Sequence, residues 1–232
     1  MKSIYNSRNT SVIICCAGMG TRLGIGTTKA LVDICGKPLI IRQLELLKEY
    51  DDIRIVVGYD AKKLVQTVTK YRRDLMIVFN YDYEKTGPGD SLRKALIGAR
   101  DIVITLDGDT LQNKEDFYGF LKYDGECIAV AENASNEGVL AEIINGEVVY
   151  LKKEHGNIQW SGIAKVKKER LCGNDSYVYE MLNRYMPLKA FMMRIREINT
   201  QEDYENAIEW YCAEQVNFKE IDNDENSYIW SI

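Results

Sequence analysis

The chain has 232 residues and a formal net charge of −5, with 46% apolar and 28% charged residues. This length fits one large α/β domain or a core with a small appendage, and the composition excludes disordered, collagen-like and linker-dominated proteins. The acidic balance disfavours binding to nucleic acids or anionic membranes, because such surfaces need an excess of Lys and Arg.

The residues 11–17 form a continuous apolar run, which is typical of a central parallel strand. A glycine-rich loop follows as far as Thr28, and the next predicted helix opens with Pro38, a preferred first helical residue. Asp90 is expected to cap a later helix. In chain order, the alternation of strands and helices continues with a helix at 38–50, a strand at 53–58, a helix at 61–71, a strand at 75–79, a loop at 84–90, a helix at 91–100 and a strand at 102–106.

Beyond residue 110 the predicted strands become shorter and more polar. Helices are expected at 113–123, 176–185 and 201–214, and strands at 127–131, 140–144, 147–151, 163–166 and 191–198. The acidic residues 215–232 are interpreted as a tail that docks loosely or not at all.

The element order predicts a single α/β domain over residues 1–232. Its first half, about 11–110, consists of repeated βα units, which form a Rossmann-like, mostly parallel sheet with helices on both faces. Its second half, about 111–214, is a mixed α+β extension of the same sheet. Ligands of open α/β sheets bind beyond the carboxyl ends of the strands. The glycine-rich loop and Asp107-Gly108-Asp109 both follow such ends.

The loop after the first strand has the composition of a phosphate site. Its glycines let backbone N–H groups approach a phosphate, and Arg22 adds a fixed positive fork. Its spacing fits neither a dinucleotide fingerprint nor a Walker A loop, and a plain tight turn is the alternative. Lys29 and Lys37 follow closely, and clustered cations in an acidic chain favour a polyphosphate ligand.

The stretch A-G-M-G-T-R-L-G…T-K-A-L…G-K-P-L-I resembles the N-terminal signature of the nucleotidyltransferases, of the MobA-like and sugar-phosphate type, that activate sugar phosphates and small alcohol phosphates. The resemblance is specific over residues 12–41 and weaker to about residue 210. Thr28 departs from it, since the family has proline before the lysine. The resemblance implies catalytic roles for Arg22 and Lys29, and it implies that the nucleotide is bound by Ala17, Gly18, Met19, Gly20, Thr21, Arg22 and Lys29.

The Asp-Gly-Asp turn is a candidate metal site. Two carboxylates that flank a glycine can hold a hard divalent cation, although a solvated turn is equally common. The resemblance implies that Asp109 binds Mg²⁺ or Mn²⁺ and that Asp107 contacts the nucleotide. Asn199 and Glu180 are candidates for a second ligand. Their alternatives are a helix N-cap for Asn199 and a surface carboxylate for Glu180.

The resemblance also extends to the substrates. The loop 86–92 matches the family's base-binding loop, which implies nucleotide contacts by Gly87 and Ser91, or simple helix capping. Acceptor-side segments look like those of bacterial choline-phosphate cytidylyltransferases, and the implied acceptor-binding residues are Asn136, Glu137, Trp160, Tyr177 and Tyr179. A carboxylate beside aromatic faces favours a cationic acceptor. Gly138 stands where that subfamily has an aromatic residue, and Trp160 is alternatively a core residue.

We therefore expect a metal-dependent cytidylyltransferase that transfers CMP from CTP to a small amine-bearing phosphate or phosphonate. Within the class, the alternative is a sugar-1-phosphate nucleotidyltransferase that uses UTP, dTTP or another nucleotide. From other classes, the alternatives are a glycosyltransferase of the GT-A type and a non-catalytic nucleotide sensor. Arg22 and Lys29 argue against the glycosyltransferase, because a nucleotide sugar has no γ-phosphate to hold. The combination of Arg22, Lys29 and Asp109 argues against the sensor.

Compartment and thiol state are also predicted. The sequence contains no apolar run long enough to span a membrane, and the polar residues 1–10 do not read as a secretory signal. The six cysteines are scattered, with Cys15 and Cys16 adjacent inside an apolar run. They predict buried free thiols in a cytoplasmic protein, because disulfides are rare in a reducing compartment.

Overall fold

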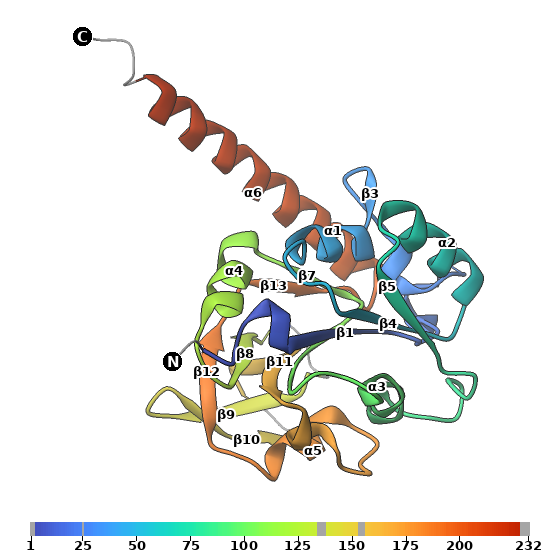
Figure 1. Cartoon of the computed structure of the whole chain (residues 1–232). Helices are drawn as coiled ribbons and strands as arrows, with labels where there is room; N and C mark the ends of the chain where they lie inside the picture. Colours follow the sequence, from blue (N-terminus) through green and yellow to red (C-terminus); the bar gives the residue numbers. More distant parts are fainter. Residues whose placement is uncertain (1–2, 25, 134–137, 153–155, 228–232) are drawn as a thin grey trace.

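A nine-stranded sheet forms the centre of the molecule, in the order β5-β4-β1-β6-β11-β8-β12-β10-β9 (Figure 1). The computed structural model describes residues 3–24, 26–133, 138–152 and 156–227, with side chains as far as residue 214. The strands of this sheet are β1 (Thr10–Cys16), β4 (Ile53–Val57), β5 (Leu75–Phe79), β6 (Ile102–Asp107), β8 (Cys127–Glu132), β9 (Leu140–Ile144), β10 (Glu147–Lys152), β11 (Ile158–Lys167) and β12 (Leu188–Met192).

The first half of the sheet is parallel, as the βα repeats predict. Both β4 and β6 run parallel to β1, and β5 runs parallel to β4. The chain leaves β1 for β4 on one side and reaches β6 on the other, so the strand order reverses between β1 and β6. Such a switch point opens a crevice at the carboxyl ends of the two strands, where ligands bind in open α/β sheets.

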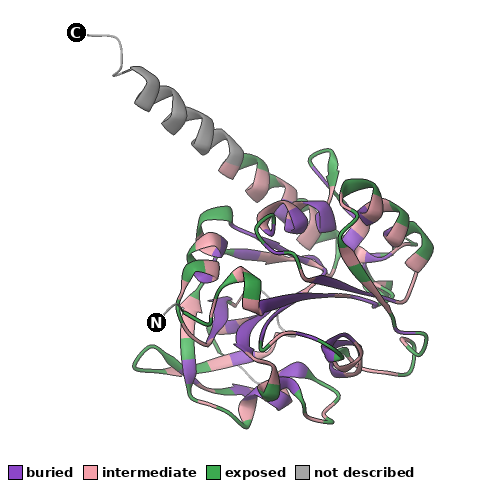
Figure 2. Ribbon diagram, viewed as in Figure 1, coloured by how far each residue is buried: buried purple, intermediate pink, exposed green. Residues whose placement is uncertain are grey.

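Helices cover both faces of the sheet, and this confirms the predicted α/β class. The helices are α1 (Leu39–Leu46), α2 (Ala61–Tyr71), α3 (Pro88–Leu96), α4 (Lys114–Lys122), α5 (Val178–Asn183) and α6 (Gln201–Ser227). One apolar core joins α1, α2 and α4 to the sheet, and a second core joins α3 and α5 to it. Figure 2 shows the central strands between these layers, such as β1, β4 and β6, as buried. None of the helices among the described residues is long and apolar enough to cross a membrane.

A third, smaller core lies beside the glycine-rich loop. It packs Leu23 of that loop against Ile34, Ile198 and Ala207. Two small sheets flank it, namely the hairpin of β2 (Asp33–Ile34) and β3 (Lys37–Pro38), and the pair of β7 (Thr110–Gln112) and β13 (Ile195–Glu197). Four 3₁₀ turns complete the fold, at η1 (Ser7–Asn9), η2 (Thr21–Leu23), η3 (Lys29–Leu31) and η4 (Lys168–Leu171).

The second half mixes strand directions, and β11 joins it to the first half. This strand runs antiparallel to both β6 and β8. Its Lys165 is only 1% exposed, and the ammonium donates to the backbone carbonyls of Phe120, Leu121 and Tyr123. These carbonyls lie in the last turn of α4 and directly after it, so a buried cation caps the helix and fixes it to the sheet.

Several predicted boundaries are corrected. The helix expected at 91–100 begins at Pro88, and Asp90 is not its N-cap but its third residue, whose carboxylate accepts from the backbone N–H of Gly87. Pro38 lies in β3 and precedes its helix instead of opening it. The residues 215–227, expected as a tail, continue α6, which extends away from the sheet (Figure 1).

The single strand expected at 191–198 is also wrong. The chain forms β12 and β13 in different sheets, separated by a bend at residues 193–194. The side chain of Arg194 fixes this bend, because its guanidinium and its backbone N–H both donate to the carboxylate of Asp116. A long-range ion pair of this kind leaves no local pattern in the sequence.

All six cysteines are free thiols, as predicted, but most are not buried. Cys16 and Cys127 are buried, Cys15 is partly buried, and the other three are exposed. Cys35 lies in a hairpin turn and Cys212 on α6, and neither belongs to the three apolar cores.

Candidate active site

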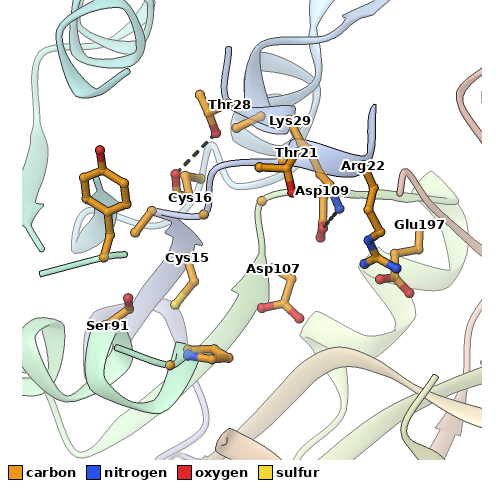
Figure 3. A pocket seen from close by; sticks show the side chains of 18 of the residues that line it. Cys15, Cys16, Thr21, Arg22, Thr28, Lys29, Ser91, Asp107, Asp109 and Glu197 are labelled. Atoms are coloured by element: carbon orange, nitrogen blue, oxygen red, sulfur yellow. Dashed lines mark hydrogen bonds and ion pairs between the residues drawn. The ribbon is translucent and has the colours of Figure 1, made fainter. Parts of the chain in front are cut away.

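A pocket of about 400 Å³ opens where β1 and β6 end, at the switch point of the sheet (Figure 3). Ten of the residues predicted to bind nucleotide or metal line it, namely Ala17, Gly18, Gly20, Thr21, Arg22, Lys29, Gly87, Ser91, Asp107 and Asp109. Met19 is not among the lining residues, and its side chain is 39% exposed. The predicted residues therefore gather at one place although they come from three separate segments.

The glycine-rich loop depends on glycine at position 20. Gly20 has a φ of +60°, a left-handed conformation that favours glycine. A Cβ at this position would lie 2.9 Å from Cγ of Lys29. The loop is thus packed closely on the lysine, and any larger residue would force the Lys29 side chain to shift.

The Asp-Gly-Asp turn is held against β1. A Cβ on Gly108 would lie 2.4 Å from Sγ of Cys16, and the Gly108 N–H donates to the carbonyl of Cys15 at 3.0 Å. From α1, the buried amide of Gln43 donates to the carbonyls of Asp107 and Thr110. This turn is therefore fixed by packing and hydrogen bonds, which does not fit the alternative of a solvated turn.

Lys29 is the centre of a polar network in the pocket. Its ammonium donates to Oδ2 of Asp109 at 2.9 Å and to Oδ1 of Asn199 at 2.5 Å. The same Asn199 oxygen accepts from the Arg22 guanidinium at 3.0 Å. Asn199, predicted as a metal ligand, lies 90 positions after Asp109 in the chain, and the fold brings the two side chains to the same ammonium.

Glu197 belongs to this site and was not predicted. It lines the pocket, and its carboxylate accepts from the side-chain amide of Asn199 at 2.6 Å. A signal for it exists in the sequence: it stands two positions before Asn199, so in an extended segment the two side chains share a side.

The pocket concentrates negative charge. Burial, followed by the charges of Asp109 and Glu197, raises the pKa of Asp107 well above its usual range. Burial and then Asp109 also raise the pKa of Glu197. The carboxylates of Asp107 and Glu197 are thus repelled by their acidic neighbours when ionised, so a cation placed among them stabilises the site.

The ammonium of Lys29 marks a point in the site where oxygen atoms surround a positive charge. A carboxylate oxygen of Asp109 and an amide oxygen of Asn199 both lie within hydrogen-bonding distance of that one positive atom. Hard oxygen donors that converge on one point are the ligands of Mg²⁺. Among the described residues, no group of three His, Cys, Asp or Glu side chains is placed to hold a metal ion, so the amide of Asn199 is essential to the fit.

Glu180 is placed differently from its prediction as a metal ligand. It is the third residue of α5 and accepts from the backbone N–H of Tyr177, which forms a capping box. Glu180 is absent from the residues that line the pocket. Its local role at the start of a helix accounts for its position, and Glu197 is the glutamate found beside Asn199.

The predicted base-binding loop is shaped by close packing. A Cβ on Gly87 would lie 2.4 Å from the carbonyl oxygen of Ser176, and the loop therefore lies directly on the segment that precedes α5. Ser91 is 6% exposed, and its hydroxyl accepts from the side-chain amide of Asn80 at 3.0 Å. Both residues still line the pocket.

Part of the predicted acceptor site falls on described residues. The rings of Tyr177 and Tyr179 lie 5.6 Å apart, and the Tyr179 hydroxyl contacts Glu180 at 3.5 Å. Trp160 is half-buried against the core on the same face of the sheet as Tyr179, and its indole N–H donates to the carbonyl of Ile163. These three aromatic residues do not line the pocket. Asn136 and Glu137 lie outside the described residues.

The acceptor half reaches the pocket through β11. At Gly162 the strand has a φ of +76°, and its register against β8 shifts between Trp160 and Ala164. A Cβ at Gly162 would lie 2.2 Å from Oδ2 of Asp107. The bulge therefore brings the backbone of β11 against the carboxylate of the first half, so the two halves meet at Asp107.

Comparisons with known proteins agree with this geometry. Residues 12–152 match a family described as the MobA-like NTP transferase domain. The bifunctional protein GlmU of Sulfurimonas denitrificans is 24% identical over 204 residues, which cover 86% of this chain and 44% of that protein. The chain thus spans less than half the length of this curated relative.

Solved structures share the fold. The CTP:phosphocholine cytidylyltransferase LicC of Streptococcus pneumoniae has a TM-score of 0.74 and 24% identity, over 88% of this chain and 99% of that one. HddC of Yersinia pseudotuberculosis has a TM-score of 0.69 and 23% identity, over 87% and 99% of the two chains. At these identities, the likeness establishes the arrangement of the sheet and helices.

Proposed function

Because the chain belongs to the MobA-like NTP transferase domain family, we propose that it transfers CMP from CTP to a small amine-bearing phosphate or phosphonate and releases pyrophosphate. One observation carries the proposal: two cations and two oxygen donors, from Arg22, Lys29, Asp109 and Asn199, form one network at the switch point of the sheet. Such a network suits the transfer of a nucleotidyl group between phosphates, because these reactions depend on positioning the phosphates and on stabilising their negative charge.

The proposed chemistry is an in-line displacement. An oxygen of the acceptor phosphate attacks the α-phosphorus of CTP, and the bond from that phosphorus to the oxygen bridging to the β-phosphate breaks. The bonding pair leaves with pyrophosphate. The attacking phosphate is already an anion, so the reaction needs no histidine base.

The chain's own cations act on the charge that develops. The N–H groups of the loop at Gly18 and Gly20 approach the triphosphate, and Arg22 contacts its outer phosphates. Lys29 donates to a non-bridging oxygen of the α-phosphate, where negative charge grows in the transition state. The side chain of Lys29 is 13% exposed in its ion pair, so water screens its charge only in part.

A divalent cation completes the proposed site. Asp109 and Asn199 would hold Mg²⁺ or Mn²⁺, which supplies charge neutralisation between the phosphates and the carboxylates. In the structure the ammonium of Lys29 donates to both of these oxygens, so a bound cation would compete with it for them. Lys29 would then be available to donate to the α-phosphate.

The choice of substrates rests on the second half. The solved neighbour LicC is named for CTP and phosphocholine. The paired rings of Tyr177 and Tyr179 beside Glu180 offer aromatic faces and a carboxylate, which together attract an ammonium group. A hexose phosphate would instead require several amide and hydroxyl groups directed at its ring.

A screen of pyrophosphate release tests the proposal. ATP, CTP, GTP and UTP are each combined with choline phosphate, ethanolamine phosphate, aminoethylphosphonate, glycerol phosphate and glucose-1-phosphate, in the presence of Mg²⁺. The variant Lys29→Ala serves as the blank in every well. We expect the highest release with CTP and an amine-bearing acceptor. Preference for glucose-1-phosphate would overturn the acceptor, and release no higher than the blank in every combination would overturn nucleotidyl transfer.

A further inference from the structure

Two exposed cysteines lie side by side although they are 177 positions apart. The Sγ atoms of Cys35 and Cys212 are in contact at 2.7 Å. Cys35 occupies the turn between β2 and β3, and Cys212 lies on α6. Among the six free cysteines, these two share a direct sulfur contact, and neither takes part in the network around Lys29.

The contact is held in place from both sides. The guanidinium of Arg42 donates to the carbonyls of Ile34 and Cys35 at 2.8 Å, and it lies over the ring of Tyr211 at 4.9 Å. The hydroxyl of Tyr204, one turn into α6, donates to the carbonyl of Asp33 at 2.8 Å. The hairpin and the helix are thus fixed to each other around the two thiols.

The backbone at Cys35 is unusual for a cysteine. Both residues of the two-residue turn have positive φ, +48° for Cys35 and +83° for Gly36. Such turns favour Asn, Asp or Gly at the first position. A cysteine there is therefore not explained by the turn itself, whereas its sulfur meets the sulfur of Cys212.

We propose that Cys35 and Cys212 are a redox modification site that forms an intramolecular disulfide on exposure to a low-molecular-weight disulfide. The thiolate of Cys212 attacks one sulfur of the oxidant, and one thiolate of the oxidant leaves. The sulfur of Cys35 then loses its proton to solvent and displaces the second thiolate. Two protein thiols are oxidised to one disulfide, and one small disulfide is reduced to two thiols.

The order of attack follows from the surroundings of Cys35. Burial, and then the hydrogen bond with Cys212, raises the pKa of the Cys35 thiol to about 11. A thiol that holds its proton at neutral pH is a poor first nucleophile. Cys35 is therefore the residue that resolves the mixed disulfide, and Cys212 is the residue that first reacts with the oxidant.

The bond would act on the small core beside the glycine-rich loop. That core contains Ile34 of the hairpin and Ala207 of α6, together with Leu23 and Ile198. Leu23 follows Arg22, and Ile198 precedes Asn199. Oxidation would therefore make this core, which positions Arg22 and Asn199, more rigid. The disulfide would also restrict a very long loop of the unfolded chain, which stabilises the folded state.

The test uses the full-length protein incubated with oxidised glutathione, blocked with N-ethylmaleimide and digested without reduction. We expect mass spectrometry to find the Cys35 peptide linked to the Cys212 peptide. The melting temperature should rise by about 4–16 °C and return on reduction. Cys172→Ser, at an exposed cysteine elsewhere, should leave both results unchanged, whereas Cys35→Ser should leave glutathione attached to Cys212.

Three results would overturn the proposal. The first is a wild-type protein that carries glutathione on Cys212 with no linked peptides. The second is a linkage between two copies of the chain, seen as a dimer on a non-reducing gel. The third is a linked form that melts at the same temperature as the reduced protein. Because the readouts are linkage and melting, each result is obtained whether or not the proposed cytidylyl transfer is correct.

Discussion

The two halves of the sheet use lysines in opposite ways. In the parallel half, Lys29 lies at the edge of a pocket and donates to side-chain oxygens of Asp109 and Asn199. In the mixed half, Lys165 is almost fully buried and donates only to backbone carbonyls at the end of α4. A cation with side-chain partners that faces open space can exchange them for a ligand. A cation that caps a helix cannot, and its role is structural.

Loss of Lys29 should have the largest effect on catalysis. Lys29→Ala removes the cation assigned to the α-phosphate, and we expect turnover to fall by ~10²-fold or more. The melting temperature should change little, because the ion pair is partly exposed. Lys37→Ala is the matched control, since this lysine lies eight positions away with a side chain 48% exposed. Turnover within a few-fold of the wild type would remove Lys29 from the catalytic role.

The next effect concerns the metal requirement. Asp109→Asn removes a charged ligand, so the Mg²⁺ concentration for half-maximal activity should rise about tenfold or more. A titration of pyrophosphate release with Mg²⁺ measures it. Asp82→Asn, at a side chain 66% exposed, should leave the titration curve unchanged. Full activity of the wild type in excess chelator would show that the reaction does not require a divalent cation.

In the other half, loss of a lysine should affect stability and not chemistry. Lys165→Met keeps an unbranched, mostly apolar side chain but removes the ammonium that donates to three carbonyls at the end of α4. We expect the free energy of unfolding to fall by about 1–3 kcal/mol in urea titrations. Turnover per folded molecule should stay near that of the wild type. Lys189→Met, at an exposed side chain of β12, is the control, and equal stability of both variants would refute the capping role.

The smallest effect is expected for the aromatic residues proposed for the acceptor. Tyr179→Ala removes a ring face, and a cation–π contact of ~0.5–2 kcal/mol corresponds to a rise in KM of about 2–30-fold for amine-bearing acceptors. Tyr179→Phe keeps the ring and should keep the KM. A KM for choline phosphate that does not change in Tyr179→Ala would place the ammonium elsewhere.

The sequence was informative where one local segment sets the structure. The apolar run of β1, the glycine loop and the Asp-Gly-Asp turn each carry their own pattern, and their meeting follows from the rule for parallel sheets. Asn199 was also found, because it stands where relatives of the resembled family have Asp or Asn before a helix. The family resemblance, and not spacing alone, supplied the roles assigned to these residues.

The sequence was uninformative where distant contacts decide. Glu197 acquires its position from the pairing of β13 with β7, and Lys165 from the end of a helix that lies more than 40 positions earlier. The break between β12 and β13 depends on the ion pair of Arg194 with Asp116. The position of the hairpin at Cys35 depends on its contacts with α6. In each case the partner is remote in the chain, so neither periodicity nor composition reveals it.

The central claim is that the CMP group of CTP, whose α-phosphorus is proposed to lie beside Lys29, is transferred to the acceptor. CTP labelled with ³²P at the α-position is incubated with choline phosphate and Mg²⁺, and the products are separated. The account predicts label in a CMP-linked product, unlabelled pyrophosphate in equal amount, and at least ~10²-fold less of both with Lys29→Ala. Pyrophosphate release with the label found only in free CMP would contradict it, because water and not the acceptor would then be the nucleophile.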